Sequence, residues 1–162
     1  MDFRPWTLLL GQIIAAGGLE RVPARISWPL HAAIMELSLD AGRRGLLATL
    51  PVQPEFEPAP EAGLRARAAD EALAELCRDG LLRRVGQLAE AALEVDPDQL
   101  VPYRRALMAL DPETVRMLQR AGSRWAALAS TAPKKAAMPA RSSGATVLSL
   151  TASRHDIVPA LQ

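Results

Sequence analysis

Hydrophobic positions recur along the first 130 residues with the period of an α-helix, in segments that glycine and proline residues separate. In the first segment, residues 5–16, the apolar side chains at positions 6, 9, 10, 13 and 14 form one helical stripe, and Gly17-Gly18 predicts the helix end. Only Thr7, Gln12 and Gly11 are expected to face water. We interpret this segment as a core helix; the alternative is an interface helix.

A second helix is predicted from the start signal Ser27-Trp28-Pro29 to Arg43-Arg44, whose positive charge suits a helix C-terminus. Gly42 and Gly45 predict breaks near its end. Its expected buried stripe consists of Leu30, Ala33, Ile34, Leu37 and Ala41.

Residues 51–63, PVQPEFEPAPEAG, carry four prolines, which exclude a helix and predict a surface loop of extended character. The loop is acidic, because Glu55, Glu57 and Glu61 lie in it, and is therefore a poor DNA contact. Phe56 within it is either a plug that packs back onto the core or an exposed anchor for a partner.

The segment from Leu64 to Val95 predicts an amphipathic helix, a stop at Gly80, and a β-hairpin around Gly86 with strands at 83–85 and 88–95. The second of these strands also has helical propensity, so a helix is the alternative there. The order of helix, stop and hairpin is typical of the third helix and wing of a winged-helix domain, a shape that contacts nucleic acid or another protein. The inner face of the helix is expected to hold Leu64, Ala69, Leu73, Leu76 and Cys77.

Two more helices are predicted at Asp96-Pro97 and Asp111-Pro112, where an aspartate cap precedes a proline in the first turn. Gly122 weakens the middle of the second. Residues 131–162 are rich in Ala, Ser, Thr and Pro and show no helical stripe. We therefore expect a winged-helix-like domain over 1–130 and a flexible tail over 131–162. The expected apolar contacts of the two helices are Leu100, Tyr103, Leu107 and Leu110, then Val115, Leu118, Trp125 and Leu128.

Composition supports a mostly α fold with a small β-hairpin, because 49% of residues are hydrophobic but only 4% are aromatic. A single cysteine excludes an intramolecular disulfide and is compatible with the cytoplasm, where we expect the protein to reside. No segment is long and apolar enough to cross a bilayer. The Arg- and Ala-rich composition is typical of bacteria with GC-rich genomes.

Candidate catalytic chemistry is sparse. The chain has two histidines, one cysteine and one tyrosine, and it lacks phosphate-loop, dinucleotide, metalloprotease and nucleophile-elbow motifs. His31 is expected to be a partly buried, hydrogen-bonded residue, and Cys77 an inert thiol on an inner helix face. The sequence therefore predicts no enzymatic activity, no cofactor and no metal site.

The predicted third helix and wing form the candidate interaction surface, but their charges oppose one another. Between residues 65 and 84 there are five arginines but also four acidic residues, and each acid near a phosphate weakens nonspecific DNA binding. A net charge of +1 likewise argues against a strongly basic nucleic-acid surface. We therefore expect a protein partner. The candidate surface consists of Phe56, Arg65, Arg67, Glu71, Arg78, Arg83 and Arg84.

The arrangement resembles the middle components of bacterial ABC-three-component anti-phage systems. The resemblance rests on RARAADEALAELCRDGLL (65–82), the hairpin around Gly86, Tyr103, and ETVRMLQRAGSRWAAL (113–128). It implies a winged-helix adaptor that bridges an SMC-like ATPase and an effector. The predicted function is thus a non-catalytic subunit of a bacterial complex. The alternatives are a winged-helix DNA-binding transcriptional regulator and an antitoxin, which the disordered tail would suit.

Overall fold

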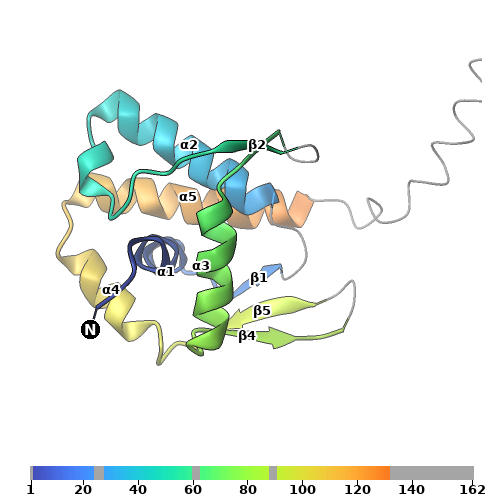
Figure 1. The fold of residues 1–162 in the computed structure, drawn as a ribbon. Helices are drawn as coiled ribbons and strands as arrows, with labels where there is room; N and C mark the ends of the chain where they lie inside the picture. Colours follow the sequence, from blue (N-terminus) through green and yellow to red (C-terminus); the bar gives the residue numbers. More distant parts are fainter. Residues whose placement is uncertain (1, 24–27, 60–62, 88–90, 132–162) are drawn as a thin grey trace, which may run out of the picture. The chain divides into compact units, whose positions relative to one another are not determined.

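Helix α1 (Pro5–Gly17) is the most completely buried element of the domain. The computed structural model describes residues 2–23, 28–59, 63–87 and 91–131, and within them the chain is mostly helical with two small antiparallel sheets (Figure 1). None of the helices in this part of the chain is long and apolar enough to cross a membrane. The predicted flexible tail lies outside the described residues, apart from Thr131, and stays a prediction.

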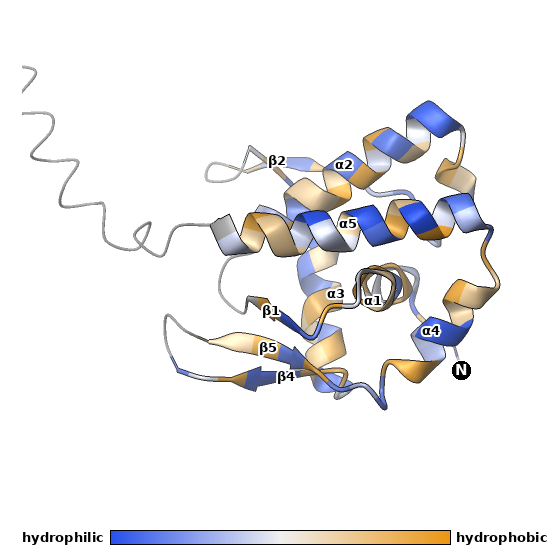
Figure 2. Cartoon of the chain, turned by 180° about the vertical axis from the view of Figure 1, so that it is seen from behind, coloured by the Kyte–Doolittle hydropathy of each residue, from blue (hydrophilic) through white to orange (hydrophobic). Residues whose placement is uncertain are grey.

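The core-helix interpretation of α1 agrees with the structure, but the expectation that Thr7, Gln12 and Gly11 face water is wrong. These residues are buried because other helices surround α1. The Tyr103 ring takes the space beside Gly11, where a Cβ would lie 2.0 Å from Tyr103 Cδ1. In Figure 2, α1 is seen end-on among α3, α4 and α5. The helix ends at Gly18, whose φ of 63° is left-handed.

Helix α2 (Trp28–Arg44) has the predicted buried stripe, including Leu30, Ile34 and Ala41. The predicted break at Gly42 is wrong, since the helix continues through it and ends before Gly45, which has a φ of 68°. Ser27 lies outside the described residues. A short 3₁₀ turn, η1 (Leu47–Thr49), follows and leads to the buried Leu50.

The proline-rich segment is not entirely a loop. Strand β2 (Glu57–Ala59) lies within it and pairs antiparallel with β3 (Gly63–Arg65), which begins at the last residue of the segment. Helix α3 (Arg67–Arg78) therefore starts later than predicted, and Leu64 is 46% exposed in β3 instead of buried. Leu73 and Cys77 are only half-buried, because they lie at the edge of the inner face of α3. That face consists of Ala69, Ala72 and Leu76.

The predicted hairpin is present as β4 (Leu82–Val85) and β5 (Ala92–Val95), with Gly86 at a φ of 80°. Residues 88–90 of the predicted second strand lie outside the described residues. A third strand, β1 (Arg21–Pro23), pairs with β5 and was not predicted. The sheet order is β1-β5-β4, so the hairpin joins the segment that follows α1. One sheet face buries Val22, Leu82, Leu93 and Val95.

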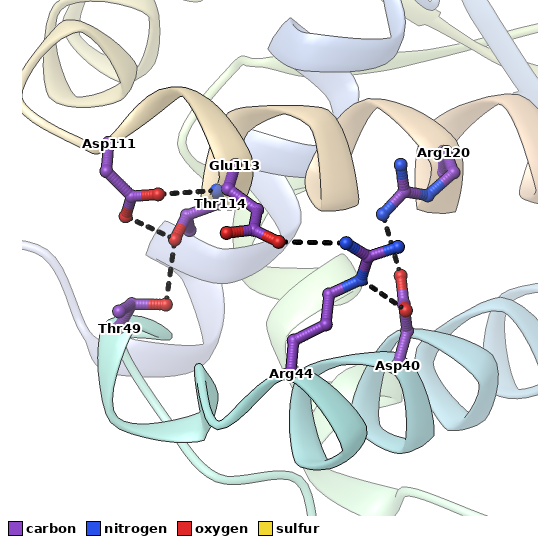
Figure 3. Close-up of polar contacts among 7 residues, drawn as sticks. All are labelled: Asp40, Arg44, Thr49, Asp111, Glu113, Thr114 and Arg120. Atoms are coloured by element: carbon purple, nitrogen blue, oxygen red, sulfur yellow. Dashed lines mark hydrogen bonds and ion pairs between the residues drawn. The ribbon is translucent and has the colours of Figure 1, made fainter.

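The two C-terminal helices follow the predicted caps only in part. Asp96 accepts hydrogen bonds from the backbone N–H of Asp98 and Gln99, but α4 (Val101–Met108) begins later, after a turn. Asp111 does cap α5 (Pro112–Thr131), with Thr114 N–H at 2.9 Å (Figure 3). The hydrogen bond that the Thr114 hydroxyl donates to Asp111, and then the one from the backbone N–H, lower the pKa of the Asp111 carboxyl.

Helix α5 is continuous through Gly122, which the sequence predicts to be a weak point. A Cβ at this position would lie 2.8 Å from Gly17 Cα and 2.7 Å from the Ile13 carbonyl oxygen. Glycine therefore permits α1 and α5 to cross backbone against backbone. The predicted contacts Leu118 and Trp125 are buried in the same core.

Candidate interaction surface

The residues of the predicted surface are spread along α3 and the strands beside it. Arg67, Glu71 and Arg78 form one exposed stripe of α3, at spacings of four and seven residues. Arg67 and Arg78 are about 16 Å apart along the helix axis, at the helical rise per residue. The candidate surface thus has an upper end near the β2–β3 hairpin and a lower end near the β4–β5 sheet (Figure 1).

Phe56 differs from the other six predicted residues. It is half-buried and packs against the hydrophobic core, just before β2 begins. This position favours the plug over the exposed anchor. The remaining predicted residues, Arg65, Arg83 and Arg84, are exposed on β3 and β4.

At the upper end, Asp70 joins an arginine and a buried histidine. Arg65 Nε lies 2.7 Å from Asp70 Oδ2, and His31 Nε2 lies 3.2 Å from Asp70 Oδ1. The contact with His31 is within ion-pair distance but falls short of hydrogen-bond geometry. Because Asp70 is engaged by these groups, less of its negative charge is available to a partner.

His31 is 2% exposed and holds α2 against the start of α3. Its Nδ1 accepts a hydrogen bond from the backbone N–H of Ala66 at 3.2 Å, so the neutral ring carries its proton on Nε2. Burial lowers the pKa of His31, and the Asp70 carboxylate opposes this shift only in part. The sequence predicts a partly buried, hydrogen-bonded histidine; the hydrogen bond is present, and the burial is almost complete.

At the lower end, Glu75 of α3 pairs with Arg4, from the residue before α1, and Arg78 lies 3.9 Å from the same carboxylate oxygen. A cleft of about 460 Å³ opens here, and its lining includes Asp2 and Asp79. Burial raises the pKa of Tyr103, which also lines this cleft. The cleft therefore offers charges of both signs.

On the sheet, Glu94 of β5 lies between two arginines. Arg83 of β4 is 3.0 Å away and Arg21 of β1 is 3.3 Å away. Their hydrogen bonds lower the pKa of Glu94, that with Arg83 most. Arg84 belongs to the other face of β4. Both Arg83 and Arg84 line a cleft together with Cys77.

Cys77 and the acidic residues give little sign of reactive chemistry. Burial raises the pKa of the Cys77 thiol, although Arg78 and Arg84 oppose the shift. The thiol is therefore protonated near neutral pH and is a poor nucleophile. Within the described ranges, no group of three or more His, Cys, Asp or Glu side chains could hold a metal ion.

Sequence reasoning missed Arg4 and Arg21, which complete the charge network. They precede their partners Glu75 and Glu94 by 71 and 73 residues, so no local pattern indicates either pair. With them included, Glu75 and Glu94 each lie near two arginines, so the network carries a positive charge on balance. Within the described residues, Arg67 and Arg84 are the arginines of the predicted set that make no ion pair.

Comparison of the chain with protein-family models, with curated proteins and with solved structures finds no match.

Proposed function

We propose that this chain is a non-catalytic adaptor that binds another protein through the exposed stripe of α3 and the β4–β5 hairpin. The order of elements supports a winged-helix arrangement. A strand follows the first helix, two further helices precede a hairpin, and the first strand pairs with the last in the order β1-β5-β4. In such an arrangement α3 and the hairpin are the parts that meet a partner.

The observation that carries the proposal is the charge of the α3 face. DNA affinity comes chiefly from basic groups that replace counterions at phosphates. Here Arg65 and Arg83 are already bound to Asp70 and Glu94, and Glu71 stands exposed in the middle of the stripe. A phosphate backbone laid along α3 would meet this carboxylate, whereas a polypeptide can offer it a basic side chain.

The resemblance of residues 65–82 and 113–128 to the middle components of ABC-three-component systems extends this proposal. The adaptor would connect an SMC-like ATPase to an effector in bacterial anti-phage defence. The burial of α1 among neighbouring helices supports a single packed domain as the connecting piece.

Affinity purification of the full chain from its native host, followed by mass spectrometry, tests the proposal. We expect a partner protein with the wild type and about tenfold less of it with Glu71→Arg, which reverses the central charge of the stripe. Glu55→Arg is the matched control, because Glu55 is an exposed acid before β2 that makes no ion pair with any described residue. Recovery of the chain alone would contradict the adaptor function.

Mobility shifts at about 50 mM and about 200 mM salt distinguish the DNA-binding alternative. The wild type is expected to bind duplex DNA weakly and without sequence preference, and Glu71→Arg to bind it more tightly. Tight, salt-sensitive binding of the wild type to a defined operator would instead indicate a transcriptional regulator.

A further inference from the structure

Helix α2 has a second apolar face that the core does not use. We define the α2 outer stripe as Trp28, Ala32, Met35 and Leu39, whose spacings of four, three and four residues place them on one side of the helix. Trp28 is 39% exposed and Leu39 57% exposed, while Ala32 and Met35 are partly exposed. The stripe lies away from the buried residues of α2 and is left open by the described part of the chain.

Two arginines border one end of this stripe. Arg43 follows Leu39 by one helical turn, and Arg116 lies on α5, which runs antiparallel beside α2. The register is fixed by ion pairs from Arg124 to Glu36 at 2.9 Å and from Arg120 to Asp40 at 2.8 Å. Figure 2 views the domain from the side on which α5 lies in front, with α2 along it.

The ion pair between Arg44 and Glu113, at 2.8 Å, shows that the start of α5 lies beside the end of α2 (Figure 3). Arg116 therefore lies near the same end of the stripe as Arg43. Arg116 is three residues after Glu113 and four before Arg120, so it shares their side of α5. It lines a groove of about 700 Å³ together with Glu36, Arg120 and Arg124.

The charged side chains beside the α2 outer stripe that make no ion pair with the described residues are positive. The acidic residues of α2 are Glu36 and Asp40, and both are engaged by α5 arginines; Asp40 also accepts from Arg44, and these bonds lower its pKa. No acidic residue occurs between Thr114 and Thr131. Within the described residues, Arg43 and Arg116 make no ion pair, so they are the charges available to a partner.

We propose that the α2 outer stripe docks an acidic amphipathic helix of a partner protein. The stripe extends over about 16 Å, which matches three turns of a helix. The apolar side chains of the partner, spaced at i, i+4, i+7 and i+11, would pack against Trp28 and Leu39. Its carboxylates would pair with Arg43 and Arg116. This inference does not depend on the proposed function of α3.

The apolar and charged parts of the face together select this occupant. A phosphate backbone would use the arginines but leave the exposed Leu39 and Trp28 without a role. A second copy of the chain would cover the apolar side chains, yet its own stripe supplies Arg43 and no unpaired carboxylate. An acidic helix satisfies both parts.

Two synthetic helical peptides of about 18 residues, long enough for the stripe, test the proposal against the full chain. Both carry leucines at the stated spacing and alanines elsewhere; one has flanking glutamates and the other flanking lysines. Fluorescence anisotropy of the labelled peptides is the measurement. We expect the glutamate peptide to bind about tenfold more tightly than the lysine peptide at low salt, and the difference to shrink as salt screens it.

Matched variants separate the two parts of the face. Leu39→Ser is expected to weaken binding of the glutamate peptide about fivefold, since burial of the exposed half of a leucine is lost. Met108→Ser, at an 86% exposed apolar residue of α4, should leave it unchanged. Replacing both Arg43 and Arg116 by serine should weaken binding of the glutamate peptide about threefold at low salt. Replacing Arg104 and Arg105 by serine is the control and should leave this binding unchanged. Circular dichroism verifies that each variant folds.

Several results would overturn the proposal. Equal affinity for both peptides would show that the arginines do not select an acidic partner. Unchanged affinity of the Leu39→Ser variant for the glutamate peptide would show that the apolar stripe does not contact it. Binding of a DNA duplex of about 20 base pairs that requires Arg43 and Arg116 but not Leu39 would make the face a phosphate site. Dimerisation in sedimentation equilibrium that Leu39→Ser abolishes would make it a self-association surface.

Discussion

Helices α2 and α3 both bury one face in the same core, but their outer faces differ in kind. On α3 the outward stripe is charged, with Arg67, Glu71 and Arg78. On α2 it is apolar, with Trp28 and Leu39 both more than a third exposed. Burial of one helix face therefore does not define the other face. For this reason we propose a different kind of partner for each helix: a polar protein surface for α3 and an acidic helix for α2.

The inner faces differ as well. Helix α3 presents mainly alanines to α1, together with Leu76, which permits close approach of the two helices. Helix α2 instead contributes larger side chains such as Leu30, Ile34 and Leu37. A substitution at Leu76 therefore acts where α3 has its largest fully buried contact.

The largest expected effect is the loss of folding in Leu76→Asp. Leu76 is 0% exposed, and an unpaired charge at this position would cost about 4 kcal/mol or more, a large fraction of the stability of a domain this size. Circular dichroism and thermal melting provide the measurement. Ala74→Asp is the control on the exposed side of the same helix and should change stability by less than about 0.5 kcal/mol. Similar melting of the two variants would show that the inner and outer faces of α3 are assigned incorrectly.

A smaller effect on the free energy of unfolding is expected from the protonation of His31, which links α2 to the start of α3. The folded-state pKa of this residue lies below 6.5, so the unfolded chain binds the proton more readily. Its contribution to stability is therefore complete above pH 6.5 and declines as the pH falls below that value toward the folded-state pKa. Denaturant unfolding across pH 5 to 8 should show this decline in the wild type.

His31→Leu removes the titrating group and leaves the buried Ala66 N–H without its acceptor. The free energy of unfolding should fall by about 1–3 kcal/mol, and its pH dependence in this range should flatten. His155→Gln alters the other histidine of the sequence and should leave the pH dependence as in the wild type. If His31→Leu retained the full pH dependence, another group would be responsible.

The sequence predicts those parts of the fold that a local pattern determines. The stripe of α2, the cap at Asp111 and the turn at Gly86 agree with the structure because apolar spacing, an aspartate before proline, and a glycine each act over a few residues. Strand β1 was missed because three residues carry no periodicity, and its pairing with β5 joins segments about 70 residues apart.

For the charged residues of the candidate surface, exposure could be predicted from the sequence, but the ion pairs could not. Exposure of Arg67, Glu71 and Arg78 follows from helical spacing alone. The ion pairs that Arg4 and Arg21 make depend on how distant segments pack, which no local pattern encodes. Helix α3 begins later than the sequence predicts because Leu64 belongs to β3, which pairs with β2, and is exposed there. The prolines of this segment predict a loop, so the pairing could not be predicted.

The smallest expected effect concerns Gly42, which the sequence predicts to break α2 and which the structure places inside it. A Cβ at this position would meet only Leu47 Cδ1, at 3.8 Å, so Gly42→Ala should raise the free energy of unfolding by about 0.5–1 kcal/mol through reduced backbone freedom. Gly45→Ala is the opposite case, because its φ of 68° is strained for alanine, and it should lower stability by about 1 kcal/mol. Melting temperatures that fell by the same amount in both variants would place the end of α2 at Gly42 and shorten the helix that carries the outer stripe.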